Sequence, residues 1–120
     1  MKYIALTLIC LLTAGTAIAQ DCTAPTEPEI PDGSSASMQQ MLEGQQAVKA
    51  FQDANADYMD CLDPQIVEAT NKATAEEASD ADRAALKSLE DAYNKAVSRE
   101  EGVAGEFNTQ IREYKEANPG

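Results

Sequence analysis

Residues 86–114 read LKSLEDAYNKAVSREEGVAGEFNTQIREY, and one set of positions in this stretch recurs at alternating steps of three and four. The set comprises Leu86, Leu89, Tyr93, Ala96, Glu100, Val103, Phe107, Gln110 and Tyr114. Because an α-helix brings such positions onto one face, the pattern predicts a long helix with coiled-coil-like spacing. Glu100 and Gln110 interrupt its apolar stripe, and the closing Asn118-Pro119-Gly120 is expected to stop the helix.

A second long helix is predicted from Ser37 to Leu62. Ser37 followed by Gln40 has the spacing of a capping box, which marks a helix start. Asp63-Pro64 is expected to end the helix, because the residue before a proline disfavours the α-helical region. The large apolar side chains form one broad stripe, made of Met41, Val48, Phe51, Tyr58, Met59 and Leu62.

A short connector helix from Pro64 to about Ala73 is predicted between the two long helices. Capping signals at Thr74 and at Ser79 compete for the start of the last helix, which we place near Ser79. Two apolar stripes joined through a short segment predict an all-α antiparallel helical hairpin, two long helices plus the connector, as one domain over residues 37–118.

Residues 20–36 form a Pro-rich arm ahead of this hairpin. Pro25, Pro28 and Pro31, followed by Asp32-Gly33, exclude a helix and favour extended, polyproline-like backbone. The arm is therefore expected to be an extended segment that leads into the first helix.

Residues 1–19 have the three parts of a cleaved signal peptide: Lys2, the apolar run Tyr3–Leu12 and the Ala17-Ile18-Ala19 site. The signal peptide would direct export, and its cleavage after Ala19 would remove Cys10, which leaves Cys22 and Cys61 in an oxidising compartment. We expect one Cys22–Cys61 disulfide. The apolar run is shorter than the roughly 20 residues that span a bilayer, so no stable membrane anchor is expected.

A bridge to Cys61 constrains the path of the arm. The 15 residues from Cys22 to Ser37 reach about 45 to 50 Å when extended, enough to run back along a helix of about 40 Å. A stripe of small residues could receive Pro25, Pro28 and Ile30; it comprises Gly44, Ala47, Ala50, Ala54 and Cys61. The alternative is an arm that is tethered at Cys22 and otherwise mobile.

Composition makes the hydrophobic core thin. Leu, Ile, Val and Phe supply 13 of the 101 residues after Ala19, a share typical of disorder, yet the helical periodicity favours an ordered structure. The disulfide, and a partner chain or homo-oligomer, would compensate for so small a core. The net charge of −12, or −13 without Lys2, argues against binding to nucleic acid.

The residue types argue against an enzyme. The chain has no histidine, the usual general base and a common zinc ligand, and its cysteines form no Cys-x-x-Cys pair. Acidic pairs such as Glu76-Glu77 are better interpreted as solvated helix surface. We predict no catalytic residue, no cofactor and no metal site.

One motif suggests a cation site. Asp53, Asn55 and Asp57 match the first three ligand positions of a calcium loop. Tyr58 stands where that loop needs glycine, and Pro64 stands where it needs glutamate. Helix surface is therefore the preferred interpretation.

Three polar residues fall on otherwise apolar stripes, namely Asn55, Glu100 and Gln110. A polar side chain at a helix interface can set register or oligomeric state at a cost in stability. Solvation at the edge of the hairpin is the alternative explanation.

The segment Cys22-x-x-Pro25-x-x-Pro28-x-Ile30-Pro31-Asp32-Gly33, with Cys61-Leu62 and the later Phe107-Asn108 to Ile111-Arg112, resembles a group of small exported proteins of Gram-negative bacteria. The resemblance covers the arm, the first helix and the end of the last helix, and it departs between Asp63 and Ser79. It implies a periplasmic location and no particular activity.

These observations together predict a non-enzymatic periplasmic helical protein. It would act through protein–protein interaction or self-association, in an envelope-structural or chaperone-like role. The alternative is a periplasmic protein that binds a small ligand or a cation with its acidic surface.

Overall fold

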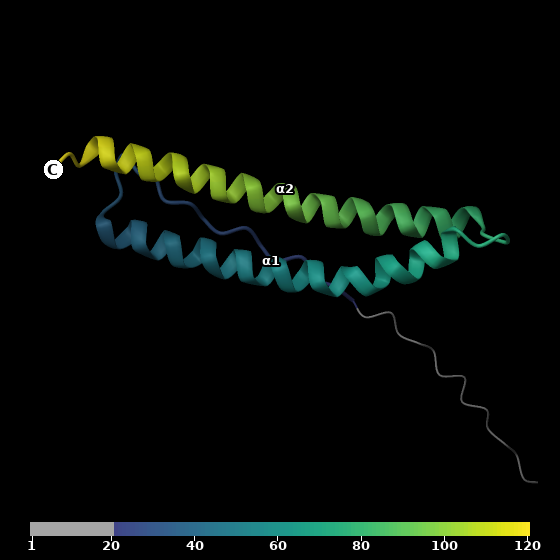
Figure 1. Cartoon of the computed structure of the whole chain (residues 1–120). Coiled ribbons are helices and arrows are strands. Elements are labelled where there is room, and N and C mark those ends of the chain that lie inside the picture. Colours follow the sequence, from purple (N-terminus) through teal and green to yellow (C-terminus); the bar gives the residue numbers. More distant parts are fainter. Residues whose placement is uncertain (1–20) are drawn as a thin grey trace, which may run out of the picture.

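The computed structural model describes residues 21–120. Two helices, α1 (Met38–Ala73) and α2 (Asp80–Ala117), lie side by side as a helical hairpin closed by the loop 74–79 (Figure 1). The prediction of an all-α helical hairpin is confirmed. The predicted signal peptide, residues 1–19 with cleavage after Ala19, lies outside the described residues.

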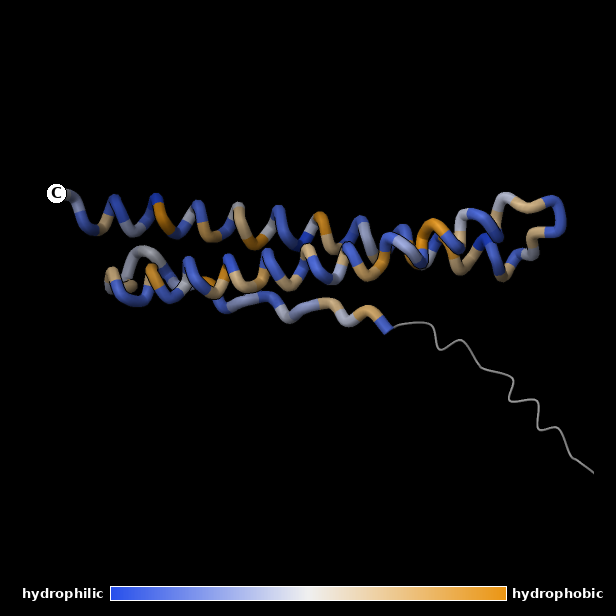
Figure 2. The backbone as a smooth tube through the Cα atoms, turned by 60° about the horizontal axis from the view of Figure 1, so that its bottom comes forward, coloured by the Kyte–Doolittle hydropathy of each residue, from blue (hydrophilic) through white to orange (hydrophobic). Residues whose placement is uncertain are grey.

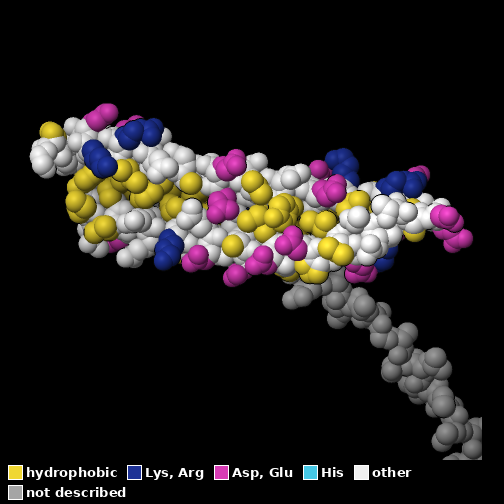
Figure 3. Space-filling model, in the orientation of Figure 1, with side chains coloured by type: hydrophobic (Ala, Val, Ile, Leu, Met, Phe, Trp, Pro, Cys, Tyr) yellow, Lys and Arg dark blue, Asp and Glu magenta, His cyan; other side chains and the backbone are white. Residues whose placement is uncertain are grey.

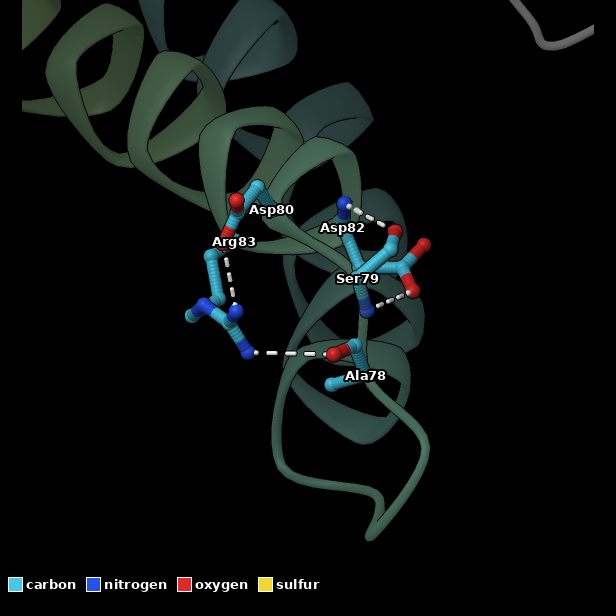
Figure 4. A network of polar contacts seen from close by, with 5 residues as sticks. All are labelled: Ala78, Ser79, Asp80, Asp82 and Arg83. Atoms are coloured by element: carbon cyan, nitrogen blue, oxygen red, sulfur yellow. Dashed lines mark hydrogen bonds and ion pairs between the residues drawn. The ribbon is translucent and has the colours of Figure 1, made fainter.

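Capping boxes begin both helices. The Ser37 hydroxyl accepts a hydrogen bond from the Gln40 backbone N–H at 3.2 Å, and the Gln40 side chain accepts one from the Ser37 N–H at 2.8 Å. Ser79 and Asp82 make the same reciprocal pair at 3.1 and 3.0 Å (Figure 4). Each pair satisfies two N–H groups that a helix start leaves without partners.

The competing capping signal at Thr74 serves the other end of α1. The backbone N–H and the hydroxyl of Thr74 both donate to the Thr70 carbonyl, at 3.0 and 2.8 Å. Thr74 is thus the C-cap of α1, and the last helix begins after Ser79.

The predicted end of the first helix at Leu62, and the separate connector helix after it, are wrong. α1 continues through Pro64 to Ala73 as one helix of 36 residues. Pro64 cannot donate to the carbonyl one turn earlier, but Leu62 and Ala69 on either side of it are both buried, so packing holds the helix together. Figure 1 shows α1 changing direction in its last third, as expected of a helix bent by proline.

The core lies between the helices toward the open end of the hairpin. Five buried side chains form it: Met41, Val48, Phe51, Val103 and Phe107. Figure 2 shows the hydrophobic positions recurring along both helices among hydrophilic ones. Of the predicted stripe on α1, Tyr58 and Met59 are only half-buried.

Within residues 21–120, neither helix combines the length and the apolar character needed to cross a membrane.

Candidate functional site

The predicted Cys22–Cys61 disulfide is present and fixes the start of the arm to α1. The two Cα atoms are 5.8 Å apart, and 39 positions separate the cysteines in the chain. The Gln65 side-chain amide, one helical turn after Cys61, donates to the Cys22 sulfur at 3.0 Å.

Arg99 attaches the middle of the arm to α2. Its guanidinium donates to the Pro25 carbonyl at 2.6 Å and to the Glu27 carboxylate at 3.0 Å. The same group lies over the Phe51 ring of α1, 5.9 Å from the ring centroid. Arg99 therefore contacts the arm and both helices, a role that sequence reasoning missed because its position carries no distinctive motif.

Gly33 is the point where the end of the arm meets α2. Its N–H donates to the Gln110 side-chain oxygen at 2.7 Å. A Cβ built on Gly33 would collide with the Gln110 backbone carbonyl, so glycine is needed here for close approach. The sequence had marked Gln110 as a polar break in an apolar stripe, and its partner is the arm.

The turn after the arm is organised by Asp32. The N–H and the hydroxyl of Ser34 donate to the Asp32 carboxylate at 3.0 and 2.6 Å. These bonds favour the ionised carboxylate, and they lower the pKa of Asp32 below its usual value. The turn redirects the chain from the arm into α1.

The arm contacts part of the small-residue stripe of α1. Pro31 packs on Gly44 so closely that a Cβ on Gly44 would lie 2.7 Å from the Pro31 ring. Ala50 and Ala54 of the same stripe are exposed, and the Pro25 carbonyl accepts a hydrogen bond from Arg99 of α2. The arm thus lies along one seam between the two helices, and we call this side the arm seam.

Asn55 is the most deeply buried side chain of the hairpin, with 0% exposure. Its amide donates to the Ala96 carbonyl of α2 at 3.0 Å and to the Glu100 carboxylate at 3.5 Å. Its own carbonyl oxygen is buried with no hydrogen-bond partner among the described residues. Two of the three polar residues noted on the stripes therefore meet each other across the helix interface.

The calcium-loop residues do not form one ligand set. Asn55 is directed into the interface, whereas Asp53 and Asp57 are exposed on the outer surface of α1. Over residues 21–120, no group of three or more acidic or cysteine side chains is arranged to hold a metal ion.

The face opposite the arm seam carries two grooves between α1 and α2. The wider groove, about 550 Å³, is lined by Val48, Phe107 and Ile111, with Lys49 and Asp53 at its edge. The narrower groove, about 370 Å³, is lined by Asp63, Ile66, Glu90, Tyr93 and Asn94. We call the line through both grooves the open seam.

Helical spacing places the two grooves on one face. Gln45, Gln52 and Asp63 are separated by 7 and 11 residues, close to two and three helical turns. Figure 1 draws the arm behind the helices, and Figure 3 shows the opposite face, where hydrophobic side chains gather in patches between the helices. In Figure 3, acidic side chains border the patch nearer the middle of the molecule, whereas Lys and Arg side chains border much of the patch at the open end.

Comparison with protein-family models, with curated proteins and with solved structures found no match to this chain.

Proposed function

We propose that the chain is a non-enzymatic periplasmic protein that acts by binding another protein or itself. Its working unit is the antiparallel hairpin with the Pro-rich arm held along it by the disulfide. An envelope-structural or chaperone-like role fits this unit, because neither role needs a reacting group.

The observation that carries the proposal is the difference between the two seams. The arm packs along one seam, while the apolar floor of the open seam faces outward in two grooves. Val97 on α2, at 36% exposure, and Leu42 on α1, at 46%, are further exposed apolar side chains, outside the residues that line the two grooves. Contiguous apolar surface rimmed by polar residues is typical of a protein interaction site.

Light scattering and crosslinking test the proposal. We expect either a concentration-dependent increase in mass or a discrete crosslinked complex with an envelope protein. Replacing Ile111 with glutamate should weaken that association, whereas replacing the exposed Glu101 of the same helix with glutamine should not. A strictly monomeric protein with no crosslinked partner would contradict the proposal.

A further inference from the structure

Building on the proposed function, we infer that the occupant of the open seam is a basic amphipathic helix of another protein. The helix would place apolar side chains in the two grooves and Lys or Arg side chains against the acidic edge of the narrower groove.

The dimensions of the open seam fit a helix of moderate length. Val48 in the wider groove and Ile66 in the narrower groove are 18 residues apart along α1, or about 27 Å at the helical rise. A partner helix of about 18 residues covers this distance with five turns. Apolar residues at helical spacing on one of its faces would reach both grooves.

The sizes of the side chains on the two seams explain why a helix should pack on the open seam better than a second extended segment would. On the arm seam, Gly44 lets the Pro31 ring approach the α1 backbone. The corresponding positions of the open seam are Gln45, Lys49 and Gln52, whose long side chains hold an incoming backbone away from α1. A helix bridges that separation with its own side chains, as ridges packed into a groove.

Charge selects a basic partner. Asp63 from α1 and Glu90 from α2 line the narrower groove together with the aromatic Tyr93. Among residues 21–120, no Lys or Arg lines that groove, whereas Lys49 offsets the charge of Asp53 at the wider groove. A Lys or Arg over the narrower groove gains two carboxylates and an aromatic face.

The same charge disfavours a second copy as the occupant. The chain has a net charge of −12, so two copies repel each other over their whole surfaces, and each would bring acidic rather than basic side chains to the groove. A cationic helix is attracted by this field before it docks.

The test uses the disulfide-bonded protein and two synthetic 18-residue helical peptides. Both carry leucine at helical spacing on one face; the other face is lysine in one peptide and glutamate in the other. Fluorescence anisotropy measures their binding to the protein and to two double variants. Asp63→Asn with Glu90→Gln alters the narrower groove, and Glu76→Gln with Glu77→Gln removes the same charge from the exposed loop.

We expect the lysine peptide to bind and the glutamate peptide not to bind. The groove variant should bind the lysine peptide about fivefold more weakly, and the loop variant should change binding less than twofold, because exposed ion pairs act locally. All four substituted residues are exposed, so the hairpin should stay folded in both variants.

Three results would overturn the inference while leaving the proposed function intact. Equal binding of the two peptides would remove charge selection, and equal weakening in both variants would show a general attraction to the acidic protein. Failure of both peptides, with a mass that rises with concentration, would identify a second copy as the occupant. If neither peptide binds, and the protein is strictly monomeric and gives no crosslinked partner, the proposed function is overturned as well.

Discussion

Loss of the Cys22–Cys61 disulfide should remove about 4 kcal/mol from the free energy of unfolding. The bridge closes a loop with a sequence separation of 39, and the chain-entropy model gives about 13 cal/mol/K for a loop of that length. The core has only five buried members in its main cluster, so this contribution is a large part of a typical stability of about 5–15 kcal/mol.

Urea unfolding followed by circular dichroism measures this loss. Cys22→Ser, Cys61→Ser and the double variant should each lose the same amount, because any one of them breaks the same bond. Ser98→Ala, which changes an exposed hydroxyl of α2, is the control and should unfold like the parent protein. A loss below about 1 kcal/mol in all three cysteine variants would refute the argument that the bridge restricts the unfolded chain.

Three further predictions concern the arm and the helix caps. Gly33→Ala should lower the melting temperature, because the added Cβ would collide with the α2 backbone. Gly102→Ala, whose Cβ would meet open space on a helix, should raise the free energy of unfolding by about 0.5–1 kcal/mol. Equal effects of the two substitutions in thermal melts would contradict the close contact at Gly33. Arg99→Lys keeps the charge but loses the planar guanidinium that reaches Pro25 and Glu27. It should lower the free energy of unfolding by about 1–2 kcal/mol and speed amide hydrogen exchange in residues 22–33. Unchanged exchange would show that the arm is held in place without these Arg99 contacts. Hydrogen bonds from Ser79 lower the pKa of Asp82 in the folded chain below its ordinary value of 3.8. The ionised Asp82 carboxylate should therefore stabilise the fold fully at a pH above 3.8, and this stabilisation should be lost as the pH falls through the lower pKa of the folded chain. Asp82→Asn should therefore melt below the parent at neutral pH and approach it in acid; a constant difference between the two would argue against this linkage.

Local signals in the sequence were enough to predict much of the hairpin. The capping boxes at Ser37 and Ser79 involve residues three apart, so their hydrogen bonds depend little on the rest of the fold. The disulfide followed from the number of cysteines left after the predicted signal peptide. Alternating steps of three and four identified the face of α2 that carries the buried Ala96, Val103 and Phe107.

Pro64 shows where local signals fail. Its effect on the preceding residue and its missing N–H both predict a break, and a helix alone in water would have ended there. In the folded chain, Leu62 before it and Ala69 after it are both buried, so a break would have moved one of them out of the interface. Tertiary packing therefore decided the length of α1, and the linear sequence carries no direct record of that packing.

The candidate site depended on register, which periodicity does not determine. The stripes predicted either an interface role or solvation at the hairpin edge for Asn55 and Glu100, and only the structure shows that they meet across the interface. Arg99 had no signal of its own, because its partners Pro25 and Glu27 are more than 70 positions away in the chain. The open seam could not be predicted from the sequence either, because it depends on how the two helices align.

The size of the side chains that flank the interface explains why the hairpin has one occupied seam and one open seam. On one side of α1, Gly44 allows the arm to approach closely, and Gly33 allows its end to reach the α2 backbone. On the other side, the longer side chains of Gln45 and Gln52 line the wider groove and leave an extended backbone less room beside α1. The disulfide can hold only one arm, and that arm follows the side on which the backbone can come near. The apolar residues on the opposite side line the open seam, where the proposed partner helix would bring its own side chains into the grooves.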